Sequence, residues 1–160
     1  MNFQMLSTAQ PALPSPSEVR DRVLAQHEAL RVLLHHALAV AAAAHRGLNE
    51  ATEEVMPLLH DIGRRMLVHM AFEESALVPL LRTADSWGEA RAQRVLDDHA
   101  HQRLEFESLV TCESWEDGSG ALILETLVCE ILIDMEVEER DVLSPDLLRD
   151  DPITIDQCSG

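Results

Sequence analysis

The sequence predicts an all-α protein, an up-down-up-down bundle of four helices. Three observations predict this fold class. Alanine and leucine are abundant while glycine is scarce, a composition that favours helices. Apolar residues recur three and four positions apart in four long segments. Short connections separate these segments, as between antiparallel neighbours. The length of 160 residues suits one domain, predicted over residues 15–148.

The first helix is predicted to follow a leader, residues 1–14, that shows little periodicity. Ser15 is the expected N-cap, and Glu18 closes a capping box with it. A proline directly after Ser15 suits the first helical position. The helix should run to about Arg46, because Gly47 is a typical C-terminal stop.

The second helix is predicted over roughly residues 51–83. Pro57 is an alternative position for its first turn, since proline is tolerated there and disfavoured in a helix interior. Pro79 lies near the end of the segment and is expected to kink it.

The third and fourth helices are bounded by clear signals. Residues 86–89 read SWGE, a capping-box pattern that opens a helix to about Thr111. A loop over residues 116–120 is rich in glycine and acidic residues. The fourth helix is predicted over residues 121–143, and a polar tail occupies residues 149–160.

Each predicted helix carries potential metal ligands on or beside its apolar face, where residues three and four apart lie together. A polar residue on a buried face is costly unless it has a partner. On the apolar faces lie His27 in the first helix, His69 and Glu73 in the second, His99 in the third and Glu138 in the fourth, with Asp134 and Glu139 at the edges of the last face.

The chain also repeats itself around two of these histidines. The hexapeptide RVLAQH ends at His27, and RVLDDH ends at His99. An arginine follows each histidine after four residues, Arg31 and Arg103. A single histidine on an apolar face is more often a core residue than a ligand. Several interior histidines and glutamates, placed twice by a repeat, indicate a metal site inside the bundle instead.

This pattern resembles the hemerythrin-like family, also called the HHE cation-binding domain. The resemblance covers about Ser15 to Leu148, and its most specific part is the segment HMAFEESALVP. The family is a four-helix bundle with the pattern His, His-x-x-x-Glu, His, His-x-x-x-Glu. The resemblance implies these residues as ligands: His27, His69, Glu73, His99 and Glu139.

One position departs from the family pattern, because Met135 stands where the last histidine should fall. Thioether is a poor ligand for ferric or zinc ions. Three arrangements stay open. Asp134 supplies a carboxylate, with Glu138 or Glu139 one turn on; or two ions bind, one of them open to water; or one ion binds, or none. With two ions, Glu73 and Glu139 are expected to bridge them, because a carboxylate has two oxygens.

The expected function is that of a non-haem di-iron protein that binds, senses or reacts with dioxygen or a related small molecule. Two iron ions per chain are expected, and one ion, manganese or zinc are the alternatives. Sensing would need a protein partner. Two other functions stay open: iron handling with ferroxidase-like chemistry, and a metal-free helical interaction module whose site has decayed. The sequence offers no nucleophile and base arranged for hydrolysis.

Charge and cysteine content narrow the setting. The net charge is −17, with 29 acidic residues against 12 arginines and no lysine, which disfavours nucleic acid and anionic membranes as partners. Three well-separated cysteines, Cys112, Cys129 and Cys158, suggest a reducing compartment. No signal peptide or membrane-spanning segment is recognisable. The expected location is therefore the cytoplasm.

Overall fold

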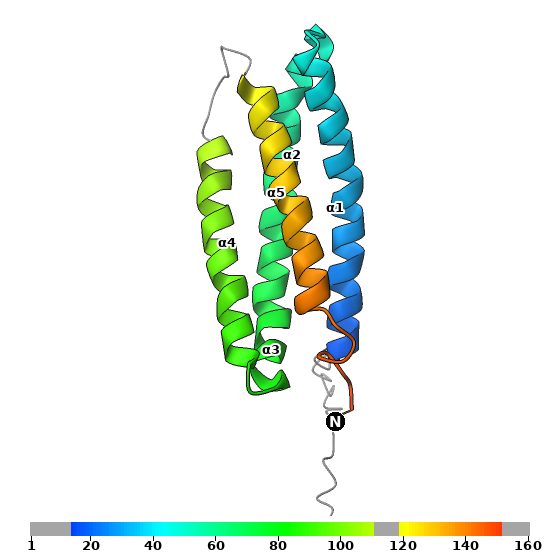
Figure 1. Ribbon diagram of the computed structural model, residues 1–160, viewed down its shortest axis with the longest axis vertical. Coiled ribbons are helices and arrows are strands. Elements are labelled where there is room, and N and C mark those ends of the chain that lie inside the picture. The colour runs from blue at the N-terminus through cyan, green and yellow to red at the C-terminus, as the bar shows by residue number, and fades with distance from the viewer. Residues whose placement is uncertain (1–13, 111–118, 152–160) are drawn as a thin grey trace, which may run out of the picture.

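The structure is a computed structural model that describes residues 14–110 and 119–151. Over these ranges it is all-helical, and its long helices alternate in direction as an up-down-up-down bundle (Figure 1). The elements are α1 (Pro16–His45), α2 (Asn49–Phe72), the π-helical turn η1 (Glu73–Leu77), α3 (Val78–Ala84), α4 (Gly88–Val110) and α5 (Ser119–Asp141). Among the described residues, no helix combines the length and the apolar composition that a membrane span requires.

Both predicted ends of α1 are confirmed. The Ser15 hydroxyl accepts from the Glu18 amide at 3.3 Å, and Glu18 accepts from the Ser15 amide at 2.8 Å, so the capping box is complete. Gly47 ends the helix with a φ of +78°, in the left-handed region that favours glycine.

The second helical segment does not begin at Pro57, and its irregular stretch lies directly before Pro79. Helix α2 begins at Asn49 and continues through Pro57, which therefore does not open it. The irregularity lies at η1, where the Val78 amide donates to the Glu73 carbonyl, five residues back. Pro79 follows directly and has no amide hydrogen to close a normal turn onto the preceding residues, which favours such a wide turn.

Helix α4 begins differently from the prediction. The Trp87 amide donates to an Asp85 carboxylate oxygen at 2.8 Å, and the Gly88 amide donates to the Asp85 carbonyl at 3.0 Å. Asp85 therefore takes the capping role assigned to Ser86. Gly88 is required at this corner, because a Cβ there would lie 2.0 Å from the Leu81 carbonyl oxygen.

Helix α5 begins and ends two residues before its predicted bounds. The predicted leader lies outside the described residues except for residue 14, as do most of the 116–120 loop and the tail beyond residue 151. The first part of the tail is tied to α1, because Asp150 accepts from the Ser17 amide at 2.9 Å and from its hydroxyl at 2.6 Å.

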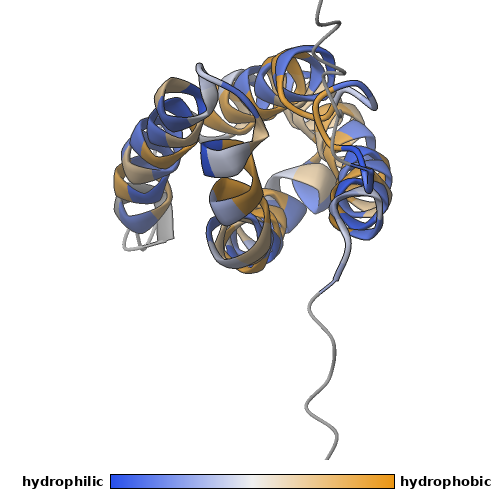
Figure 2. Ribbon diagram, turned by 90° about the horizontal axis from the view of Figure 1, so that it is seen from below, coloured by the Kyte–Doolittle hydropathy of each residue, from blue (hydrophilic) through white to orange (hydrophobic). Residues whose placement is uncertain are grey.

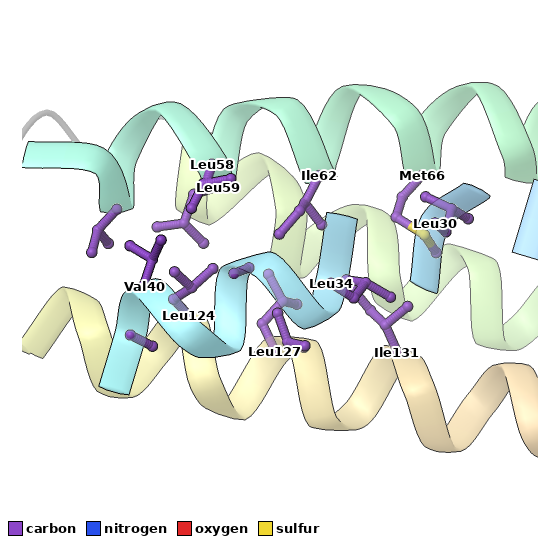
Figure 3. Packing of buried hydrophobic residues seen from close by; sticks show 14 of the residues in the cluster. Leu30, Leu34, Val40, Leu58, Leu59, Ile62, Met66, Leu124, Leu127 and Ile131 are labelled. Atoms are coloured by element: carbon purple, nitrogen blue, oxygen red, sulfur yellow. The ribbon is translucent and has the colours of Figure 1, made fainter. Parts of the chain in front are cut away.

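The core forms two apolar clusters, one above the other, and the apolar faces of the helices turn toward the bundle axis (Figure 2). The larger cluster joins α1, α2 and α5, as Leu34, Ile62 and Leu127 illustrate (Figure 3). The smaller one lies at the α3 end and includes Val23 and Leu81. Along every long helix, a buried or half-buried polar residue separates the two clusters.

Candidate metal centre

A polar layer crosses the bundle between the two apolar clusters. His27, His69, Glu73 and His99 are buried in it, with exposed fractions of 0%, 4%, 0% and 6%. They come from α1, α2, η1 and α4. The sequence therefore predicted correctly that these side chains point inward. Burial of so many polar groups is costly unless they bind one another or a ligand.

Four side chains of this layer converge on one point: His27, His69, Glu73 and Glu138 each offer a nitrogen or oxygen, and these atoms all lie within 4.8 Å of one another. The Nε2 atoms of His27 and His69 are 3.1 Å apart. Glu73 Oε1 lies 3.2 Å from His69 Nε2, and Glu138 Oε2 lies 3.5 Å from His27 Nε2. Two imidazoles and two carboxylates form a set that suits iron, manganese or zinc.

His99 meets the same group from the other side, through Glu73. Its Nε2 lies 3.0 Å from Glu73 Oε2, whereas Glu73 Oε1 turns to His69 and His27. Glu73 therefore lies between His99 and the other members of the four-residue group, the position from which one carboxylate could contact two ions.

Each buried histidine also contacts a side chain outside the four-residue group through its Nδ1 atom. Glu139 lies 2.8 Å from His27 Nδ1, and Arg31 donates to the same Glu139 oxygen at 2.6 Å. Glu74 lies 3.1 Å from His99 Nδ1, and Arg103 donates to that oxygen at 2.6 Å. His69 differs, because its Nδ1 contacts the neutral amide oxygen of Gln26 at 2.8 Å. Such outer partners orient metal-binding imidazoles.

The two outer Arg–Glu pairs fix the tautomers of His27 and His99. Arg31 and His27 keep the pKa of Glu139 low despite burial that raises it. A hydrogen bond from Arg103 likewise lowers the pKa of Glu74. An ionised carboxylate can only accept, so His27 and His99 donate through Nδ1. Their Nε2 atoms, which face the layer, are then free of hydrogen unless the ring takes up a second proton.

Burial and neighbouring charges shift the pKa values of the inner side chains. Burial raises the pKa of Glu73 to about 7, and His99 opposes the rise. Burial lowers the pKa of His69 to about 4, and neighbouring His27 adds to this shift. For His27, burial lowers the pKa, but Glu138 and Glu139 outweigh it and the net shift is upward. Without a metal ion, the raised pKa values of Glu73 and His27 favour bound protons in the layer.

Two carboxylate oxygens of the layer stay without a hydrogen bond although they are buried. They are Glu73 Oε1 and Glu138 Oε1. Buried polar atoms are nearly always satisfied, so an unpartnered carboxylate oxygen calls for an unseen ligand. Both belong to the four-residue group. Its side chains therefore fit a metal ion.

The fourth helix departs from what the family resemblance implied. Glu138 joins the four-residue group, whereas Glu139, the expected bridge, lies outside it against His27 Nδ1. Asp134 is exposed and accepts from Gln102 at 2.8 Å, so it does not replace the missing histidine. Met135 is 3% exposed and lines the same cavity as Glu73 and His99. Glu138 therefore faces inward, as the apolar spacing of α5 predicted, and the family resemblance pointed to the wrong neighbour.

Sequence reasoning missed the outer partners of the histidines. Glu74 is the immediate neighbour of Glu73, and Gln26 of His27. The signal that could have found them was in the repeat, because Arg31 and Arg103 each stand four residues after a histidine without an assigned role.

A cavity of about 110 Å³ opens onto the polar layer between α4 and α5. His69, Glu73, His99 and Glu138 line its inner part, together with Met135. A cavity of this size has room for a few water molecules or a molecule of a few atoms. The layer is therefore accessible from one side of the bundle.

No protein-family model, curated protein or solved structure matches the chain.

Proposed function

We propose that this protein is a hemerythrin-like, non-haem iron protein that binds dioxygen or a related small molecule, or reacts with it, at the polar layer. The observation that carries the proposal is the facing pair of His27 and His69 nitrogens, 3.1 Å apart. Both rings donate outward through Nδ1, to Glu139 and to Gln26. Two lone pairs then point at each other, an arrangement that is relieved by a proton on one ring or by a metal ion held between or beside the two nitrogens.

The same contacts support a proposal of two ions. His27, His69, Glu73 and Glu138 would hold the first ion. His99 and Glu73 would hold the second, beside the cavity. Glu73 would bridge the two positions, as the sequence predicted, while Glu138 would take the part that was expected of Glu139. The second position has fewer protein ligands and so leaves room for an exogenous molecule.

The side chains around the layer have separate tasks. Bound iron would supply the electrons and the open coordination position that dioxygen chemistry needs. Glu139 and Glu74 orient the imidazoles and keep their Nδ1 protonated. The two apolar clusters above and below the layer exclude bulk water from it. The cavity between α4 and α5 gives a small molecule access.

Iron handling is the second candidate, and the replacement of histidine by Met135 favours it. The inner group contains two carboxylates, Glu73 and Glu138, beside two imidazoles. Carboxylate oxygens favour a hard, more oxidised ion. That preference suits oxidation and release of iron better than reversible binding of dioxygen.

Metal content of anaerobically purified protein tests the proposal. Wild-type protein should contain iron, and His69→Ala should lose it together with the stabilisation that the ion gives. His36→Ala is the matched control, because His36 pairs with Glu54 on the surface at 2.9 Å. A visible absorption that appears only after exposure to air would support dioxygen chemistry, whereas iron without it would support iron handling. A folded wild type that takes up no metal would contradict both and favour an interaction module.

A further inference from the structure

Helix α5 presents one carboxylate per turn along its side facing α4. Glu130, Asp134 and Glu138 are spaced four residues apart, so they lie on one face of the helix and span about 12 Å. These three residues form the α5 carboxylate row. Its lower end, Glu138, belongs to the four-residue group of the polar layer.

Two adjacent hollows lie along the α5 carboxylate row. The cavity of about 110 Å³ reaches from the polar layer to Asp98, Gln102 and Asp134. The same three residues also line a second hollow of about 280 Å³, which continues toward Glu130. The row therefore borders two adjacent hollows that share a wall and together extend from the surface to the buried layer. The Gln102 amide donates to Asp134 from across the seam between α4 and α5.

The inner hollow, the cavity of about 110 Å³, is strongly negative. Five carboxylates line the inner cavity against one guanidinium, that of Arg94. Arg94 lies 3.7 Å from Asp98, and Asp141 pairs with Arg140. Asp134, in contrast, accepts from the neutral amide of Gln102. A cleft lined by one sign of charge concentrates ions of the opposite sign.

The inner end of this cavity is built to receive a cation. Glu73 is 0% exposed, lines the cavity, and leaves its Oε1 without a hydrogen bond. Glu138 Oε1 is unpartnered as well. The carboxylates of the row thus lead from exposed Glu130 through Asp134 to buried oxygens that lack a partner.

We propose that divalent metal ions enter the bundle along the seam between α4 and α5, passing from Glu130 to Asp134 and Glu138 before they reach Glu73. The inference rests on the proposed function, because it requires that the polar layer binds metal. Carboxylate oxygens replace the water of a hard divalent cation one at a time. The row then determines how fast the ion arrives, and the layer determines how tightly it is held.

The rate of Co²⁺ uptake by the full-length, metal-free protein tests this route. Uptake is followed by rapid mixing at low ionic strength through the visible absorption of bound Co²⁺. Glu130→Gln and Asp134→Asn should each slow uptake, and the two together should slow it on the order of tenfold. Asp134→Arg should slow it further. The final absorption and the equilibrium affinity should stay near those of wild type, because neither residue is in the four-residue group.

Glu136 provides the matched control on the same helix. It is exposed and lies two positions from Asp134, on another face. Glu136→Gln and Glu136→Arg make the same charge changes and should leave the uptake rate unchanged. The rate differences should also disappear in about 1 M salt, where the Debye length falls to about 3 Å.

The outcomes separate the route from the proposed function. Full Co²⁺ binding at equal rates in all variants would overturn the route and leave the metal site standing. Equal slowing by the Glu130 and Glu136 variants would also overturn it, since net charge would then explain the effect. A folded wild type that binds no Co²⁺ would overturn both. If Asp134→Arg does not fold, the neutral variants of these exposed positions still decide the question.

Discussion

Glu73 and His99 meet across the polar layer, with Glu73 Oε2 3.0 Å from His99 Nε2. His99 donates outward to Glu74, so both atoms of this inner contact are acceptors unless a proton lies between them. Burial raises the pKa of Glu73 to about 7, which supplies that proton near neutral pH. A bound metal ion would take the place of this proton.

Glu73→Gln should stabilise the metal-free protein and abolish metal binding. The folded-state pKa of Glu73 is raised from 4.5 to about 7, so its ionised form opposes folding above pH 7 and not below pH 4.5. An amide removes this cost, so the gain in stability should be larger at pH 8 than at pH 5. Urea unfolding at pH 8 and at pH 5, with chelator and with Co²⁺, measures both effects. Stabilisation by Co²⁺ that survives in the variant would show that Glu73 is not a ligand.

Metal affinity should fall as the pH drops below 7. The Glu73 proton must leave before an ion binds, and its pKa is about 7. The pKa values of His27 and His99 are also raised by their carboxylate neighbours against the effect of burial, so the affinity should fall by about tenfold or more per pH unit on the acid side. His69 has a pKa near 4 and stays neutral in this range. Co²⁺ titrations at pH 8, 7 and 6 measure the dependence. A constant affinity from pH 8 to 6 would contradict the assignment of Glu73.

Glu139→Gln should weaken metal binding although Glu139 is outside the four-residue group. The amide keeps a hydrogen-bond acceptor for His27 Nδ1 and removes the negative charge that strengthens the ligand. Loss of such an outer partner typically costs 10–100-fold in affinity. Glu54→Gln makes the same change in a surface pair with His36 and should have no effect. Equal affinities in the wild type and Glu139→Gln would leave Glu139 a purely structural role.

Met135→His should add a ligand beside the second ion position. Met135 is buried and lines the cavity with Glu73 and His99, so an imidazole there replaces a thioether that binds hard ions poorly. Tighter binding of the second ion is expected in Co²⁺ titrations and in metal analysis. Met135→Leu conserves apolar volume and should bind as the wild type does. If both variants behave alike, residue 135 does not face the ion.

The helical pattern was predictable because it depends on local interactions. The capping box at Ser15 and the stop at Gly47 involve residues close in sequence, and both are found as expected. The inward direction of His27, His69 and His99 follows from the spacing of the apolar residues around them. The capping role of Asp85 was missed, because Ser86 offered an equally good local signal.

By itself, the sequence determined the number of long helices, their amphipathic faces and four of the buried polar residues. The apolar spacing favoured Glu138 and the family resemblance favoured Glu139, and only the tertiary structure decided between them, because packing sets the rotation of a helix about its axis. The same holds for the outer partners, since Glu74 reaches His99 from η1 and Glu139 reaches His27 from α5. Contacts between distant helices depend on how the two apolar clusters pack, which no local pattern encodes.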